Sequence, residues 1–324
     1  MAWDRVIELA IGPDPNAGVG VLVSDLDVSF RVHRSTIFSD NSAEFTIYNA
    51  APNTRKEILV EGSSLVLRAG YRDSGVGTIF VGSVTKAISG RAGADWVTEI
   101  KASAVRGAGR PLDSTMISLS YAPETTVAVM LADVAAALGL VLTGRENAQI
   151  PMTNGWAFAG RARDALTWAS NALKTRGVGL YVDNAEIVIY MAGQPSTKFT
   201  AAYLTYETGL LSARDITEDP DTGFVARARA AGAIVSGEQG QPVTPQAVRR
   251  AEARIAALRL PPTMPRRVAF KAMLIPKLQP NSVLQIKTPE ISGVYIADTL
   301  DFQGSNFEND FIVEGEASAP TGAQ

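Results

Sequence analysis

Two distant segments of this 324-residue chain resemble each other, and no other feature of the sequence constrains the fold as strongly. Residues 78–104 align with residues 293–319 without a gap, and both segments end in Ala-Ser-Ala. The matched residues include Phe80 with Tyr295, Asp95 with Asp310, Trp96 with Phe311, and Glu99 with Glu314. Internal repeats indicate a chain built from copies of one unit. We therefore predict the same small β unit near both ends, against the alternative that two unrelated hairpins look alike.

The first 111 residues have the pattern of short antiparallel strands. Within residues 44–48, Phe45 and Ile47 alternate with more polar side chains, as in a strand with one buried face. Glycine, aspartate, asparagine and serine separate the runs, and this spacing is typical of a small sandwich or barrel. The predicted strands cover residues 6–9, 20–23, 28–32, 44–48, 64–69, 78–84 and 96–102.

The middle of the chain has a different pattern, with two helices and a hairpin. Apolar residues at helical spacing predict a helix between Thr125, a candidate N-cap, and Gly139, a candidate C-terminal glycine. A second amphipathic run predicts a helix over residues 162–176. The segments GLYVD and AEIVIY then read as strands that meet at Asp183 and Asn184, because both residues tolerate the positive φ angles of a type I′ turn.

The last third of the chain again reads mainly as strands, with one insertion. Residues 236–267 contain a polar loop and a helix predicted over residues 244–260, with Pro245 at its first position. This helix is strongly basic. A solvated surface accounts for such a run, but arginine also forms bidentate hydrogen bonds to carboxylates, so a partner interface is the alternative. Its candidate residues are Arg249, Arg250, Arg254 and Arg259.

Together these patterns predict an α+β, β-rich fold with two similar small antiparallel β-barrels and an α+β middle domain. We expect the first barrel over residues 1–111, the middle domain over residues 112–199, and the second barrel, with the insertion at about 236–267, over residues 200–324. Such a repeat has a physical use. Three chains in a closed ring present six similar units, so a threefold object acquires approximate sixfold symmetry.

The sequence offers little for catalysis or metal binding. It has no cysteine, which excludes disulfides, thiolate nucleophiles and cysteine-ligated metals. His33 is the only histidine, and it reads as a surface residue on a strand rather than as the base of a Ser-His-Asp triad. The acidic cluster of Asp215, Glu218, Asp219 and Asp221 reads as a solvated turn, although glycosidases also use paired carboxylates. We predict no catalytic, metal-binding or cofactor-binding residues and no cofactor.

Charge and hydropathy argue against nucleic-acid binding, a signal peptide and membrane insertion. The formal net charge of −3 gives no overall attraction for nucleic acid. The N-terminal sequence MAWDRVIELAIG lacks the basic start and apolar run of a signal peptide. The longest apolar stretches are shorter than the ~20 residues of a membrane span, so we expect no membrane insertion.

Two long stretches carry a resemblance to a known family. They are ILVEGSSLVLRAGYRDSGVGTIFVGSV near the front of the chain and SGVYIADTLDFQGSNFENDFIVEGEA near its end. The first contains an F-x-G-x-V strand, formed by Phe80, Gly82 and Val84. In layout over most of its length, the sequence resembles the baseplate hub proteins of contractile-tailed bacteriophages, which are related to the base of type VI secretion spike proteins. The segment at 236–267 departs from this pattern.

The resemblance implies a structural virion protein rather than an enzyme. It implies a homotrimer that adapts the sixfold tail tube to the threefold central spike and leaves a channel through which DNA passes without specific binding. The implied partners are tail tube proteins, the central spike protein and baseplate wedge proteins, in a tail baseplate assembled in the host bacterial cytoplasm. The alternatives are a tail-associated peptidoglycan hydrolase and a carbohydrate-binding tail-tip protein. The expected anchors of the two tail-tube-like barrels are Phe80, Gly82, Trp96, Tyr295 and Phe311.

Overall fold

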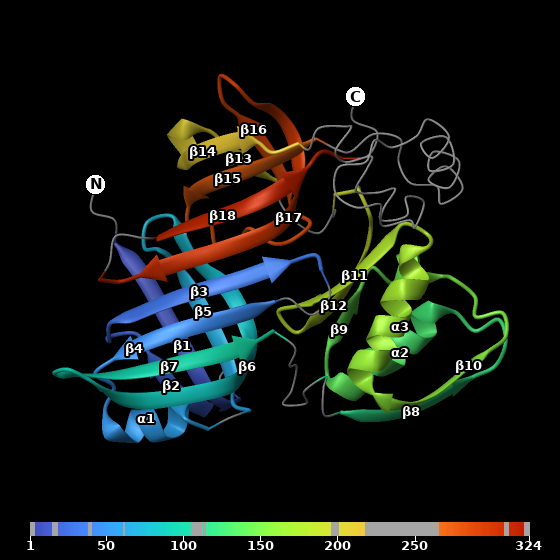
Figure 1. The fold of residues 1–324 in the computed structure, drawn as a ribbon, viewed down its shortest axis with the longest axis horizontal. Helices are drawn as coiled ribbons and strands as arrows, with labels where there is room; N and C mark the ends of the chain where they lie inside the picture. Colours follow the sequence, from blue (N-terminus) through green and yellow to red (C-terminus); the bar gives the residue numbers. More distant parts are fainter. Residues whose placement is uncertain are drawn as a thin grey trace, which may run out of the picture.

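The computed structural model describes residues 4–14, 19–37, 41–60, 62–104, 112, 115–195, 201–217, 266–307 and 311–320. The fold is α+β and rich in β-strand, as the sequence predicts, with a 13-stranded sheet, a three-stranded sheet and a two-stranded sheet. Figure 1 shows two β-rich parts, one above the other at the left, and a part with two helices at the right. Among the described residues, no helix has the length and apolar character needed to cross a membrane.

The first β unit, from β1 to β7, contains every strand predicted for this part of the chain. Its strand order is β3-β4-β7-β6-β5-β1-β2, and all neighbours are antiparallel. The elements are β1 (Arg5–Asp14), β2 (Val19–Val23), β3 (Val28–Ser35), β4 (Ser42–Tyr48), α1 (Pro52–Ile58), β5 (Ser64–Tyr71), β6 (Gly75–Ala92) and β7 (Asp95–Ser103). Helix α1 was not predicted; it begins with Pro52, which favours a first helical turn, and buries Ile58.

The middle unit has its own apolar core beneath two helices. Both predicted helices occur, although α2 has Thr126 rather than Thr125 at its N-cap, and Gly139 ends it with a φ of 70°. The elements are β8 (Met116–Tyr121), α2 (Val127–Leu138), β9 (Val141–Thr143), η2 (Arg145–Ala148), β10 (Trp156–Arg161), α3 (Ala162–Lys174), β11 (Val178–Asp183) and β12 (Glu186–Met191). Strands β11, β12 and β9 form one small sheet, and β8 pairs with β10.

The second β unit, from β13 to β18, repeats the strand order of the first. The order β14-β15-β18-β17-β16 corresponds to β3-β4-β7-β6-β5, and neighbours within these five strands are antiparallel in both units. The units differ beyond this order, since β13 pairs parallel with β16 whereas β1 pairs antiparallel with β5. The elements are β13 (Ala202–Leu204), η3 (Tyr206–Thr208), β14 (Leu210–Asp215), β15 (Arg267–Met273), β16 (Val283–Lys287), β17 (Ser292–Ser305) and β18 (Phe311–Ser318). The two segments matched in sequence therefore form the corresponding hairpins β6–β7 and β17–β18.

A shared β-bulge fixes how the two hairpins correspond. In the first hairpin the register shifts at Thr85, and in the second it shifts at Asp298. The strands opposite these bulges match as the sequence alignment predicts, so Trp96 and Phe311 are equivalent. The preceding strands, however, are offset by two residues from the gapless alignment, because the turn before Phe311 is two residues longer than the turn before Trp96. The alignment of Phe80 with Tyr295 is therefore wrong by two positions.

This offset exchanges an aromatic residue and a glycine between the units. Phe80 is equivalent to Gly293, and Gly82 is equivalent to Tyr295. In the first unit the Phe80 ring occupies the space beside Gly82, where an added Cβ would lie 2.7 Å from the ring. In the second unit the Tyr295 ring lies beside Gly293 in the same way, with a corresponding distance of 3.2 Å. In both units an aromatic ring thus packs beside a glycine of the same strand, but the ring and the glycine have exchanged positions.

The two β units share one sheet and one apolar core. Residues Thr299–Ser305 of β17 pair antiparallel with Ser29–Ser35 of β3, which joins the units edge to edge. A single cluster of buried side chains continues across this joint. Within the described residues the strand pairings follow an open path from β14 to β2, from which β16 and then β13 branch at β17, and no pairing closes either unit on itself.

Candidate functional site

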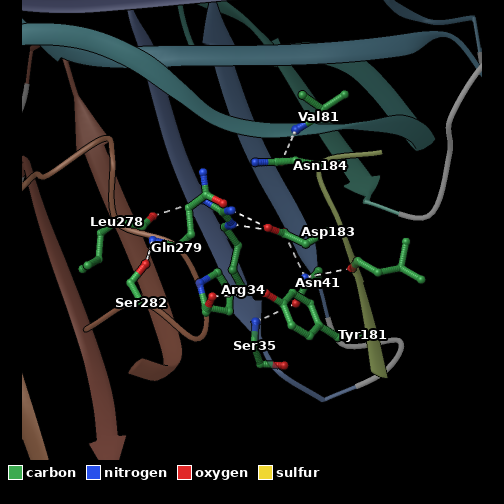
Figure 2. A network of polar contacts seen from close by, with 12 residues as sticks. Arg34, Ser35, Asn41, Val81, Tyr181, Asp183, Asn184, Leu278, Gln279 and Ser282 are labelled. Carbon is green, nitrogen blue, oxygen red and sulfur yellow. Dashed lines mark hydrogen bonds and ion pairs between the residues drawn. The ribbon is translucent and has the colours of Figure 1, made fainter. Parts of the chain in front are cut away.

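A buried polar network lies where the three units meet, and Figure 2 shows its members. Its centre is Arg34, whose side chain is fully buried. The strand pattern explains this position. Along β3, Val28, Phe30 and Val32 face the core, and Arg34 is the next residue on the same face. A guanidinium in such a place needs a buried anion and further hydrogen-bond acceptors.

Arg34 finds these partners on both other units. Its Nε donates to Oδ1 of Asp183 at 3.1 Å, and its Nη2 donates to Oδ2 of the same carboxylate. Its Nη1 donates to the carbonyl oxygen of Leu278 at 3.4 Å, and its guanidinium carbon lies 5.8 Å from the ring centre of Phe302. One side chain of the first β unit therefore binds the middle unit through a bidentate ion pair and also contacts the second β unit.

The turn between β11 and β12 positions the carboxylate. Asp183 pairs with Glu186, so the two turn residues are Asn184 and Ala185, with φ angles of 45° and 65°. The predicted turn at Asp183 and Asn184 is thus wrong by one residue, because Asp183 is the last residue of its strand. Positive φ at both turn positions is the geometry expected of a type I′ hairpin. The tight turn lets the hairpin insert its tip between the β units.

Asn41 and Asn184 complete the network on the side of the first β unit. The Asn41 amide donates from Nδ2 to Oδ1 of Asp183 and to the carbonyl of Val182, both at 3.0 Å. Its Oδ1 accepts a hydrogen bond from the backbone N–H of Ser35 at 2.6 Å. The turn residue Asn184 accepts from the backbone N–H of Val81 on β6 at 2.8 Å. The hairpin tip is therefore bonded to both β3 and β6.

Tyr181 extends the contact toward the second β unit. Its hydroxyl donates to the carbonyl oxygen of Pro280 at 3.1 Å. Burial raises the pKa of Tyr181, and the negative charge of Asp183 raises it further, so the hydroxyl remains a donor at neutral pH. With its charges paired and its polar atoms bonded, this network is built to fix the relative orientation of three units.

Four of the five expected anchors lie in the apolar core. Phe80, Tyr295 and Phe311 are almost fully buried, and Gly82 is buried beneath the Phe80 ring. Phe311 lies at the joint between the β units. Its ring makes edge contacts with Phe30 at 6.2 Å and with Tyr71 at 5.1 Å between ring centres. The first β unit thus covers the aromatic residue of the second.

Trp96 does not fit the expectation of a core anchor. It is 40% exposed, and the guanidinium of Arg55 lies 4.1 Å from its ring centre. The reason is its place at the turn end of the hairpin, beyond the region that the rest of its own unit covers. Phe311 is buried at the equivalent position because another unit packs against it, whereas no described residue of a further unit covers Trp96.

The remaining sequence predictions concern charged residues. His33 lies on the surface of β3, as predicted, and its Nδ1 is 2.8 Å from Oδ1 of Asp301 on β17. Hydrogen bonds from Thr217, together with the neighbouring Arg266, lower the pKa of Asp215.

The other predicted charged residues lie outside the described residues. They are the rest of the acidic cluster and the basic helix with Arg249, Arg250, Arg254 and Arg259, so the partner interface stays a prediction. The described residues contain no group of three or more possible metal-ligating histidine, aspartate or glutamate side chains.

The network at Arg34 was not predicted from the sequence, although the sequence contains a signal for it. Val28, Phe30, Val32 and Arg34 share the period of two that marks the buried face of a strand. Arginine is almost never fully buried without a partner. An arginine on that face therefore predicts a buried acid elsewhere in the chain, but nothing in the pattern identifies the acid as Asp183.

The fold matches solved structures of tail proteins. The tail protein from Neisseria meningitidis MC58 is 13% identical over 98% of this chain and 97% of its own, with a TM-score of 0.61. The 43 kDa tail protein of prophage MuSo2 from Shewanella oneidensis is 10% identical over 98% of both chains, with a TM-score of 0.58.

A type VI secretion component of E. coli, the c3393 protein, has the same fold. It is described as structurally similar to the T4 tail proteins gp27 and gp5, and it is 10% identical over 92% of this chain and 74% of its own, with a TM-score of 0.51. No protein-family model and no curated protein matches the sequence. At these identities the likeness is one of fold, and it agrees with the resemblance to baseplate hub proteins drawn from the sequence.

Proposed function

We propose that the chain is a structural subunit of a phage-type tail, a baseplate hub that forms a homotrimer on the tail axis. Each chain contributes two copies of one small barrel-like unit, over residues 1–111 and 200–324, with residues 112–199 as a middle domain on the outside. The ring of six units abuts the sixfold tail tube, and the threefold symmetry matches the central spike. Wedge proteins bind its outer side.

The repeated strand order is the observation that carries this proposal. Five consecutive strands have the same order and directions in both units, and both hairpins have a bulge at the same place. If each chain contained only one such unit, a trimer would present three equivalent units, and its contacts would have only threefold symmetry. A chain with two equivalent units, joined by the pairing of β17 with β3 and by the contact of Arg34 with Leu278, gives a trimer that is approximately sixfold on one face.

The polar face of the long sheet suits the wall of a channel. Side chains on this face form cross-strand ion pairs, with nitrogen and oxygen 2.5–2.7 Å apart. They are Arg267–Glu316, Lys271–Glu314 and Lys101–Glu44. Unpaired arginine and lysine would hold DNA phosphates, whereas locally neutral pairs weaken such binding. We therefore assign this face to the lumen through which DNA passes.

Electron microscopy of the purified full-length protein tests the proposal. The expected particle is a threefold ring with a central hole and six similar lobes on one face. Mass measurement by light scattering in the same sample should give three chains. A solid particle, or a ring with another number of chains, would contradict the hub.

A further inference from the structure

The joint between the two β units is an edge-to-edge strand pairing, and the repeat contains a second copy of each edge. Strand β17 of the second unit pairs with β3 of the first. By strand order, β17 is equivalent to β6, and β3 is equivalent to β14. The counterpart of the observed joint is thus a pairing of β6 with β14. One chain cannot form it, because β6 and β14 lie at opposite ends of the two β units in Figure 1.

Both of these edges are open in the described part of the chain. Strand β6 pairs with β5 as far as Ser83, and beyond Val84 its pairings within the described residues are with β7 alone. Strand β14 ends the sheet and pairs with β15 on one side. Each edge also exposes apolar surface, since Ile88 is 51% exposed and Leu211 is 50% exposed. Open strand edges of this kind are templates for pairing with another chain.

We propose that β6 of one copy pairs antiparallel with β14 of the next copy. The pairing repeats between chains the joint that β17 and β3 make within a chain, and it rests on the proposed function, which supplies the second copy. The contact is head-to-tail, so it propagates until the ring closes. The long sheet then continues without interruption around the ring.

The internal joint also fixes the register of this pairing. Asp301 faces His33 across the joint, and their side chains touch at 2.8 Å. The residues equivalent to these two are Ile88 and Ile216, which directly follows β14 and donates its backbone N–H to the carbonyl of Arg267. Between copies, Ile88 therefore faces Ile216, an apolar cross-strand pair where the chain itself has the hydrogen bond between His33 and Asp301. In the same register Arg91 lies diagonal to Asp215, which adds a favourable charge contact.

The exposure of Trp96 agrees with this arrangement. Its equivalent, Phe311, is buried because β3 and Tyr71 of the neighbouring unit cover it. In the proposed pairing, Ala213 of β14 takes the place that Phe30 has at the internal joint, next to Arg91 and the Trp96 ring. A small residue there leaves room for the larger tryptophan.

Disulfide trapping tests the pairing and its register, and the absence of native cysteine gives a clean background. The double variant Ile88→Cys with Ile216→Cys places one thiol on each edge. Facing residues of antiparallel strands have Cα atoms about 4.5–5.5 Å apart, which a disulfide spans. The matched control, Ser89→Cys with Ile216→Cys, shifts the register by one residue and turns the thiols to opposite faces.

Under mild oxidation, the facing pair should give covalent dimers and trimers on non-reducing gels, at least ten times more than the control. Light scattering on the unoxidised proteins is measured in parallel. A trimeric mass without cross-linking, or equal cross-linking in both variants, would overturn the strand pairing and leave the trimer intact. A monomeric mass at every concentration, without cross-linking, would remove both the pairing and the trimeric hub.

Discussion

Arg34 and Asp183 form an ion pair with almost no solvent contact, so removing one partner leaves the other charge buried and unpaired. We expect Arg34→Met to lower the free energy of unfolding by about 3–5 kcal/mol. The double variant Arg34→Met with Asp183→Leu should recover part of this loss, because it removes both charges together. Chemical denaturation of the three proteins measures the difference.

The matched control is the exposed pair of Lys101 and Glu44, whose side chains are 61% and 58% exposed. Because water screens this pair, Lys101→Met should change the free energy of unfolding by no more than about 1 kcal/mol. If Arg34→Met had an equally small effect, the joint would not hold the three units together.

Asp298, at the bulge of β17, gives the protein a pH dependence. Burial is the main cause that raises its pKa from 3.8 to about 6. The folded chain therefore binds this proton more tightly than the unfolded chain, so the stabilisation is complete below about pH 4 and is lost as the pH rises through 6. We expect Asp298→Asn to raise the free energy of unfolding at pH 8, by at most about 3 kcal/mol, and to have little effect at pH 4.

Urea denaturation of Asp298→Asn and the wild type at both pH values measures this gain. Glu99→Gln, at an exposed position on β7, is the control and should not change the difference between the two pH values. A gain for Asp298→Asn that was the same at pH 4 and pH 8 would mean that the carboxylate charge is not its cause.

The two equivalent aromatic residues of the hairpins should differ in their effect on the isolated chain. Phe311 is 3% exposed, so Phe311→Ala should cost roughly 3–5 kcal/mol. Trp96 is 40% exposed and has mainly the contact with Arg55, so Trp96→Ala should cost only about 1 kcal/mol. Thermal or chemical unfolding of the monomer measures both. Equal losses would show that Trp96 is a core residue after all.

At the scale of elements, the sequence predicted most strands and helices, because their patterns are local. The alternation around Phe45 and the glycine that ends α2 each identify one element without reference to the rest of the chain. What the sequence did not predict depends on distant contacts. Trp96 is exposed because no other unit in the described part of the chain covers it, and the partner of Arg34 lies 149 residues away. The two-residue offset between the hairpins arises because the turn before Phe311 is two residues longer than the turn before Trp96, and an alignment without gaps does not allow for that difference.

Strand positions beside an aromatic ring should tolerate substitution according to the space that the ring leaves. An added Cβ at Gly82 would lie 2.4 Å from the carbonyl oxygen of Ser103, so Gly82→Ala should cost about 1–3 kcal/mol. At Gly293 the nearest atom is 3.2 Å away on the Tyr295 ring, which can shift, so the loss should be smaller. Gly90, with no atom within 4 Å, is the control and should lose no stability. The unfolding midpoint should therefore fall most for Gly82→Ala, less for Gly293→Ala and not at all for Gly90→Ala. Another ranking would contradict the packing of the Phe80 and Tyr295 rings beside these glycines.

At the scale of the whole molecule, the internal repeat allows the same kind of strand pairing to join units within one chain and between chains. The pairing of β17 with β3 shows which edges fit, and the same fit between copies would leave no open edge in the long sheet at β6 or β14. The rigid joint at Arg34 serves this assembly, because a ring closes only if the angle between successive units is fixed. The contacts of Arg34 that stabilise the chain therefore also favour closure of the ring, so stability and assembly are linked.

This linkage predicts that thermal stability depends on protein concentration. A chain whose edges pair with other copies gains stability by mass action, so its unfolding midpoint should rise as the concentration is raised. The variant Ile88→Lys places a charge on the β6 edge, and its midpoint should be independent of concentration. Met116→Lys, at a 69% exposed position of the middle unit, is the control and should keep the wild-type dependence. Calorimetry over a hundredfold range of concentration measures all three, and a wild-type midpoint that did not move would argue against assembly through these edges.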